Sequence, residues 1–191
     1  MNFAADYFAQ VAQMLGTLST DTVQAIVDRL WRAYQEEAQV FTCGNGGSAL
    51  AASHFATDMG KGVDLPAGAR RFRMVSLVDN VGLLTAYAND MGYEHVFSEP
   101  LLNLVRPGDV LLAVSGSGRS PNVLRAMETA KQAGASVLAL AGRDGGLMPQ
   151  AADLCLTAAV ESMQQIEDAH LVIFHCLYLE LKGRAERAAG R

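Results

Sequence analysis

The chain has 191 residues, of which 50% are hydrophobic and 18% are charged. This composition excludes a disordered or fibrous chain, and the length fits one domain. With 20 acidic and 15 basic residues the formal net charge is −5, which argues against nucleic-acid binding through a basic surface.

Two features of the sequence predict a cytoplasmic protein. No apolar run of about 18 residues is present, so no membrane span is expected, and the first ten residues lack the pattern of a signal peptide. The three cysteines, Cys43, Cys155 and Cys176, form no CxxC pattern, and we interpret them as reduced thiols in the core.

Residues 1–37 are predicted to form two helices. Apolar residues recur at helical spacing from Phe3 to Leu15, and a second stripe runs from Val23 to Tyr34. Ser19 offers an N-cap between them. A broad apolar stripe on a leading helix must be buried against the core or against a partner subunit, and we expect both.

From residue 38 onward, short apolar runs alternate with helical patterns. The runs are QVFTC, RMVSLV, DVLLAVS, SVLALAG and DLCLTAAV, and the helical patterns lie near 48–60, 80–105, 120–134 and 163–182. This alternation predicts an α/β fold, in which helices cover both faces of a five-stranded parallel sheet. We expect a single domain over 1–191, with the α/β sandwich at 38–182 and a frayed basic tail at 183–191.

The loop that follows DVLLAV is predicted to bind phosphate. It reads SGSGRSPN from Ser115 to Asn122, and Ser120 and Pro121 suit the start of a helix. Glycines let a ligand approach the backbone, and hydroxyls beside the positive end of a helix favour an anion. The alternative is an ordinary strand-to-helix turn with a good cap.

The loop that follows VFTC, residues 44–49, matches the G-x-G-x-x-A pattern of dinucleotide-binding proteins. That pattern also needs an acidic residue about 20 positions later, but the nearest candidate, Asp79, lies about 35 positions on. We therefore interpret it as a second polar loop that faces the first one, with Asn45 and Ser48 binding hydroxyl groups or phosphate.

Two helical segments carry groups that could bind a metal or move a proton. His54 and Asp58 are spaced i, i+4, so they could share a divalent metal or form a surface ion pair. Glu167 and His175 are eight residues apart, about 12 Å along a helix. One metal could contact both only from between them; otherwise they serve different copies of a site across a subunit interface. His175 also lies in an apolar run that we expect to be buried.

Together these motifs resemble the SIS (sugar isomerase) family of phosphosugar-binding proteins, most closely its phosphoheptose isomerase branch. The matching segments are CGNGGS, HFATD, ANDMGYEHVFSEPL, GDVLLAVSGSGRSPNV, AGRDGGLM and QIEDAH. The resemblance implies a three-layer, flavodoxin-like SIS fold and a homotetramer with active sites at subunit interfaces. It also implies conversion of sedoheptulose 7-phosphate to D-glycero-D-manno-heptose 7-phosphate through an enediol.

The resemblance also assigns roles to individual residues. Substrate contacts are expected at Asn45, Gly46, Gly47, Ser48, Asn89, Asp90, Ser115, Gly116, Ser117 and Ser120. A divalent metal, expected to be zinc, would be bound by His54, Asp58, Glu167 and His175. Asp58 and His175 are assigned to proton transfer, with Glu167 as an alternative base.

Three positions depart from the family pattern. Asp58 stands where a longer Glu is usual, Glu167 where a neutral Gln is usual, and Gly116 where Thr is usual. A second carboxylate would favour a divalent cation more strongly, so we interpret the metal site as retained in a different form.

Two other functions stay open at this point. One is a non-catalytic SIS adaptor that resembles the replication initiator-associating protein, but the acidic Asp58 and the presence of His175 favour an enzyme over this adaptor. The other is an isomerase or sensor of another sugar phosphate, since no residue fixes the carbon number or stereochemistry of the sugar.

Overall fold

The computed structural model describes residues 2–61, 65 and 70–189. Five parallel strands form one sheet in the order β2-β1-β3-β4-β5, which is the strand order of flavodoxin-like folds. The strands are β1 (Gln39–Cys43), β2 (Arg73–Ser76), β3 (Val110–Ser115), β4 (Ser136–Gly142) and β5 (Leu154–Ala158). The predicted α/β class and parallel sheet are therefore confirmed.

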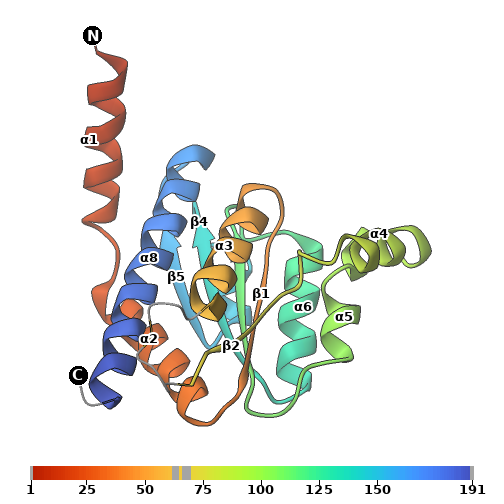
Figure 1. Cartoon of the computed structure of the whole chain (residues 1–191). Coiled ribbons are helices and arrows are strands. Elements are labelled where there is room, and N and C mark those ends of the chain that lie inside the picture. The colour runs from red at the N-terminus through yellow and green to blue at the C-terminus, as the bar shows by residue number, and fades with distance from the viewer. Residues whose placement is uncertain (1, 62–64, 66–69, 190–191) are drawn as a thin grey trace.

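Helices cover both faces of this sheet (Figure 1). They are α1 (Phe3–Leu15), α2 (Thr20–Gln35), α3 (Gly47–Lys61), α4 (Val81–Asp90), the 3₁₀ turn η1 (Tyr93–His95), α5 (Ser98–Leu102), α6 (Pro121–Gln132), α7 (Met148–Ala151) and α8 (Met163–Ala188). Helices α2, α3 and α8 form the core of one face, and α5, α6 and α7 that of the other.

The apolar strand sequences follow from burial on both faces. In β3, Leu112 and Val114 point to the core under α3 and α8, whereas Leu111 and Ala113 point to the core under α5 and α6. Because successive side chains alternate between the faces and both faces are covered, nearly every position of a central strand is apolar. The near-continuous runs of Val, Leu and Ala are explained by this arrangement.

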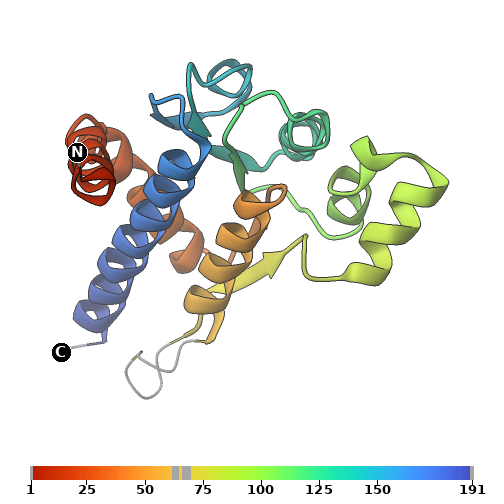
Figure 2. The ribbon, with the colours of Figure 1, turned by 90° about the horizontal axis from the view of Figure 1, so that it is seen from above.

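The segment predicted as one helix near 80–105 is instead divided into α4, η1 and α5. Gly92 has a φ of +102°, a conformation that helical residues do not adopt and that favours glycine. The chain therefore turns at this point, and α4 lies at the outer edge of the molecule (Figure 2).

The tail predicted to fray from residue 183 is helical as far as Ala188, so this expectation was wrong. Ala185 is buried, and Arg184 forms ion pairs with Asp28 at 2.7 Å and with Glu180 at 3.1 Å. These contacts order the last turns of α8 against α2. Residues 190 and 191 lie outside the described part of the chain.

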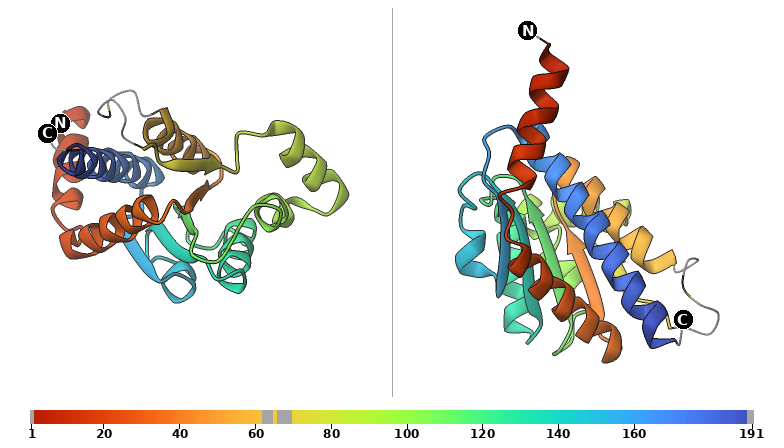
Figure 3. Two further views of the ribbon diagram at one scale, coloured as in Figure 1. Left: turned by 60° about the horizontal axis from the view of Figure 1, so that its bottom comes forward. Right: turned by 90° about the vertical axis from the view of Figure 1, so that its left-hand side faces the viewer.

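Helix α1 extends away from the sheet and lies along the first turns of α8 (Figures 1 and 3). Tyr7 donates a hydrogen bond to Asp168 at 2.5 Å, and Met14 is the one buried residue of the helix. Phe3 and Phe8, in contrast, are 81% and 69% exposed. Within one chain, the apolar stripe predicted on this helix is thus only partly covered.

Strand order and register bring the two polar loops to the same edge of the sheet. Strands β1 and β3 are neighbours, and Cys43 pairs with Ala113, so the loops that begin at Gly44 and follow Ser115 leave the sheet side by side. The order of connections reverses between these strands, and ligands bind at such a point in open parallel sheets.

Candidate active site

The loop from Ser115 to Ser120, here called the serine loop, brings three hydroxyls together. Ser115 Oγ lies 3.1 Å from Ser120 Oγ and 3.4 Å from Ser117 Oγ, and it accepts a hydrogen bond from the Gly118 N–H. Ser120 holds the N-cap position of α6, but its side chain makes no capping bond. The Ser120 hydroxyl is therefore not used as a cap, and it lies at the positive end of the α6 dipole, where an anion is favoured.

The serine loop is held by the segment after β4. Gly118 has a φ of +62°, and a Cβ there would collide with the carbonyl of Gly145. Leu147 N–H donates to the Gly118 carbonyl, and Arg119 forms a bidentate ion pair with Asp144, which lowers the pKa of that carboxyl. The segment AGRDGGLM thus fixes the loop conformation.

Gly116 leaves space that another side chain fills. A Cβ at this position would lie 2.5 Å from the Sδ of Met163, the first residue of α8. The thioether of Met163 therefore takes the place where a threonine side chain would project.

The loop after β1, residues 44–46, is joined to the serine loop by a pair of carboxamides. Asn45 exchanges two hydrogen bonds of 2.8 Å with Asn122 of α6, and Tyr93 of η1 donates to Asn45 Oδ1 at 3.1 Å. Neither Asn122 nor Tyr93 was among the predicted site residues. The signals were that Asn122 follows Ser120 by two residues and that Tyr93 lies in the ANDMGYEHVFSEPL segment.

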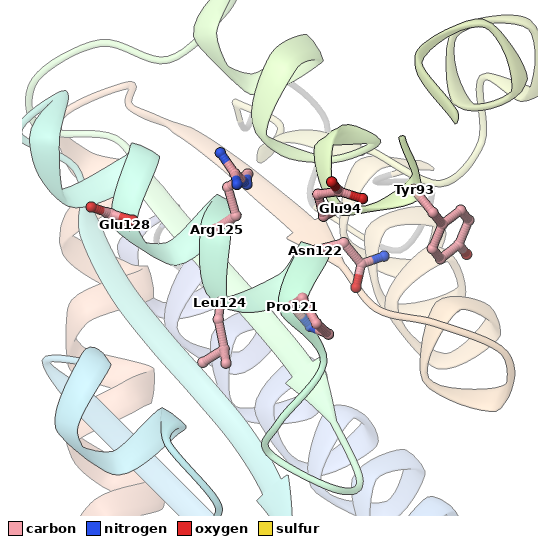
Figure 4. A pocket seen from close by; sticks show the side chains of 7 residues that line it. All are labelled: Tyr93, Glu94, Pro121, Asn122, Leu124, Arg125 and Glu128. Atoms are coloured by element: carbon pink, nitrogen blue, oxygen red, sulfur yellow. The ribbon is translucent and has the colours of Figure 1, made fainter. Parts of the chain in front are cut away.

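Two cavities adjoin this carboxamide pair. The larger, of about 650 Å³, is bordered by Tyr93, Glu94, Pro121, Asn122, Leu124, Arg125 and Glu128, and Figure 4 shows Tyr93 at one end and Glu128 at the other. The smaller, of about 190 Å³, is bordered by Tyr93 and Asn45 together with Gly44, Gly46, Ser53 and Asp79. Tyr93 lies on both.

Three of the four expected metal ligands converge on one surface. His54 and Asp58 of α3 and His175 of α8 each offer a ligand atom, and these atoms lie within 4.8 Å of one another. His54 Nε2 is 3.0 Å from Asp58 Oδ2, and the His54 and His175 rings meet edge to face at 5.2 Å. Figure 2 shows α3 and α8 side by side, as this cluster requires.

The pairing of α3 with α8 is fixed by the core beneath the cluster. Phe55 and Phe174 are both buried, and their rings stack at a centroid distance of 4.7 Å. Phe55 follows His54 and Phe174 precedes His175, so the stacked rings place the two histidines at the same level of the two helices.

The electrostatic environment keeps Asp58 ionised. Burial by itself would raise the pKa of the Asp58 carboxyl, but the hydrogen bond from Lys61 Nζ at 2.9 Å, the charge of Lys61 and the adjacent His54 outweigh it. The pKa of Asp58 is therefore lower than its ordinary value. An ionised carboxylate beside two imidazoles is a donor set that suits a divalent metal.

The remaining predicted residues lie elsewhere in the single chain. The Glu167 carboxylate occupies the space that a Cβ on Gly47 would take, at the start of α3, rather than joining the histidine cluster. Asn89 and Asp90 are the exposed last residues of α4, where Asn89 donates to the Asp90 carboxylate at 2.8 Å. Ser48 is buried in the first turn of α3.

Two expectations about burial on α8 were wrong. His175 and Cys176 are exposed, whereas the buried histidine is His170. Helix α8 turns Phe174 and Leu177 into the core and directs residues 172, 175, 176 and 179 outward. Among the other cysteines, Cys43 is buried, which raises the pKa of its thiol to about 12, and Cys155 is half-buried.

We expect His170 to make the fold acid-sensitive. The side chain is 1% exposed and its Nε2 lies 3.2 Å from the Ala141 carbonyl. Burial lowers the pKa of His170 from 6.5 to about 4, so the folded chain holds a neutral ring. Between these pH values the unfolded chain binds a proton that the folded chain does not. The free energy of unfolding should therefore fall by up to about 3 kcal/mol as the pH drops through this window.

Urea denaturation of the wild-type protein and of His170→Gln at pH 7 and pH 4.5 measures this effect. Carboxylates also titrate in this range. The informative quantity is therefore the difference between the two proteins in how steeply the free energy of unfolding changes with pH. Equal pH slopes would contradict the assignment.

No helix in the described part of the chain has the length and apolar character needed to cross a membrane.

Comparisons with known proteins agree with this architecture. Residues 6–142 match the family model described as SIS domain. The phosphoheptose isomerase of Mycobacterium tuberculosis (strain ATCC 25177 / H37Ra) is 39% identical over 160 residues, which cover 82% of this chain and 79% of that protein. The phosphoheptose isomerase of Rhodospirillum rubrum is 42% identical over 139 residues, or 73% of each chain.

Two solved structures extend the comparison. The phosphoheptose isomerase from Neisseria gonorrhoeae has a TM-score of 0.87 at 29% identity and covers 94% of this chain and 97% of that one. The phosphoheptose isomerase from Francisella tularensis, with a TM-score of 0.89 at 24% identity over 95% and 97% of the two chains, shares the fold. Since the family model spans more than half of the sequence and these relatives span most of it, the chain belongs to the SIS domain family, within the group of the phosphoheptose isomerases.

Proposed function

We propose that the protein is an aldose–ketose isomerase that converts sedoheptulose 7-phosphate to D-glycero-D-manno-heptose 7-phosphate. The observation that carries this proposal is the convergence of His54, Asp58 and His175 from two helices, in a fold whose serine loop gathers three hydroxyls at the start of a helix. The similarity to phosphoheptose isomerases supports the choice of substrate.

The serine loop would hold the phosphate end of the sugar. Ser117 and Ser120 offer hydroxyls, and the start of α6 offers the positive end of the helix dipole. The phosphate is remote from the reacting carbons, so these contacts contribute binding and orientation.

The reaction moves a proton between two carbons through an enediol. We assign Asp58 and His175 to this transfer, one taking the carbon-bound proton and the other protonating oxygen or carbon. The lowered pKa of Asp58 keeps it ionised but makes it a weak base. Glu167, whose carboxylate lies beside Gly47, is the alternative base.

The cluster fits a divalent metal, which we propose to be zinc. Two imidazoles and a carboxylate form a common set of three protein ligands for zinc with an open fourth position. When bound, the metal would polarise the sugar carbonyl and stabilise negative charge on its oxygen. Asp58 and the two histidines would hold it, and Glu167 is the proposed further ligand.

We propose that a second copy of the chain completes the site, in a homotetramer. The outward face of α3 and α8 carries the cluster between exposed apolar side chains, Leu50, Val172 and Leu179. The exposed Phe3 and Phe8 on α1 need a similar cover. In such an assembly, Glu167 or the Asn89–Asp90 pair of one subunit could face the cluster of another.

The comparisons do not favour the adaptor function, since the relatives named above are isomerases. An isomerase of another sugar phosphate would use the same serine loop and cluster, and the substrate assay below distinguishes it. We place the protein in the cytoplasm, where sugar phosphates are made and its thiols stay reduced.

The protein should isomerise sedoheptulose 7-phosphate, lose this activity after treatment with a metal chelator, and regain it when zinc is added. A panel of ketose phosphates assayed in parallel identifies the preferred sugar. Turnover that survives chelation would contradict the metal. Turnover of another ketose phosphate alone would contradict the heptose assignment.

A further inference from the structure

The carboxamides of Asn45 and Asn122 link the two loops that we propose to bind substrate. Each side chain donates to the other at 2.8 Å, and Asn122 is only 2% exposed. Tyr93 adds a hydrogen bond of 3.1 Å to Asn45 Oδ1. The pair therefore crosses from the end of β1 to the first turn of α6.

A backbone donor fixes the orientation of this pair. The Val123 N–H belongs to the first turn of α6, where amides lack an intrahelical acceptor, and it donates to Asn122 Oδ1 at 3.0 Å. Because a backbone N–H can only donate, the oxygen of Asn122 must lie there. Asn122 Nδ2 is then directed to Asn45 Oδ1, and the orientation of Asn45 follows.

The hydrogen-bond inventory shows what remains for a ligand. The Asn45 oxygen accepts from Asn122 and Tyr93, and the Asn122 oxygen accepts from Asn45 and Val123. Both acceptors are thus fully used, since a carboxamide oxygen has two lone pairs. One N–H is left on each side chain, so the pair offers donors and no acceptor.

We propose that Asn122 is a positioning residue for the isomerase reaction, assisted by Tyr93, and that it holds the Asn45 carboxamide with one N–H toward an acceptor oxygen of the sugar phosphate. The inference rests on the proposed function. Asn45 and Asn122 border different cavities and Tyr93 borders both, so the fixed pair stands where a ligand would pass between them.

The principal test is Asn122→Asp, which keeps the shape and the acceptor atoms but removes the donor to Asn45. Two oxygens would then face each other, and turning the Asn45 carboxamide over would only set its oxygen against the other carboxylate oxygen. The Asn45 side chain would therefore be displaced, and its N–H would be lost to the ligand. We expect KM to rise about tenfold, as the loss of one well-placed hydrogen bond gives, and kcat to stay within about twofold. Asn103→Asp, at an exposed position after α5, controls for the added charge and should leave KM unchanged.

A double-mutant cycle separates positioning from general stability. In an Asn45→Ala background, Asn122→Asp should raise KM no further, because the side chain through which it acts is gone. Tyr93→Phe removes a single donor at an exposed residue and should give a smaller rise, which also vanishes in this background. This variant decides the question if Asn122→Asp does not fold.

If the wild type turns over the substrate and both Asn122→Asp and Tyr93→Phe have an unchanged KM, the positioning role is overturned but the proposed function is not. Additive effects in the Asn45→Ala background would also overturn it. If the wild type fails to turn over sedoheptulose 7-phosphate, the proposed function fails. The affinities of the same variants for this sugar phosphate, measured by calorimetry, then decide the positioning role on their own.

Discussion

Replacement of His175 by alanine should abolish isomerisation while sugar-phosphate binding is retained. His175 stands with Asp58 and His54 at the cluster, and we assign it to proton transfer, a contribution that typically amounts to roughly 10²–10⁴ in rate. The serine loop, which would hold the phosphate, lies outside this cluster. We therefore expect kcat to fall by about two orders of magnitude or more. The dissociation constant of the sugar phosphate should stay nearly unchanged.

A coupled isomerase assay and calorimetry with sedoheptulose 7-phosphate measure the two quantities separately. His95→Ala is a matched control, because His95 also pairs with a carboxylate four residues away, Glu99 at 3.2 Å, but belongs to η1. This control should keep its turnover. Turnover at the wild-type rate in His175→Ala would refute the proposed role.

Much of the fold could be predicted from local patterns. Apolar runs such as DVLLAVS can be buried on both faces only in a covered parallel sheet, and β3 meets this condition. The i, i+4 spacing of His54 and Asp58 likewise predicted that their side chains meet, because residues four apart on a helix are neighbours whatever the helix packs against.

Features that depend on distant packing could not be predicted. The middle of α8, residues 169–179, is apolar apart from His170 and His175, so its sequence did not indicate that His170 faces the core and His175 faces outward. The position of Glu167 beside Gly47 depends on how α8 crosses α3, which no local pattern encodes. The link from Asn122 to Asn45 joins residues 77 positions apart.

Gly92 illustrates a third kind of limit. Apolar spacing continued through residues 80–105, and a single glycine did not outweigh it in the helix prediction. Its φ of +102° is a property of the folded chain, in which η1 and α5 pack against α6 and force the turn. A conformational requirement of this kind becomes visible only when the neighbouring elements are in place.

The double substitution Ser117→Ala, Ser120→Ala should raise KM for the sugar phosphate by about 100-fold and leave kcat nearly unchanged. Each hydroxyl would lose one hydrogen bond to a charged phosphate, and two such losses give a change of this size. Because the phosphate is bound equally in the ground state and the transition state, its loss appears in KM. Steady-state kinetics with sedoheptulose 7-phosphate measure the rise in KM. With the unphosphorylated sugar, which has no phosphate to bind, the double variant and the wild type should show the same KM.

The structure supplies a contrasting control for this experiment. Ser19 caps α2 by accepting a hydrogen bond from the Thr22 N–H, whereas Ser120 makes no capping bond. Ser19→Ala should therefore cost about 1 kcal/mol of folding stability without changing KM, and the double variant should do the reverse. Unchanged kinetics in the double variant would remove these hydroxyls from the phosphate site. A lower free energy of unfolding without a rise in KM would show that these hydroxyls stabilise the fold instead of binding phosphate. Hydroxyls whose role is to bind an anion contribute little to the stability of the ligand-free loop.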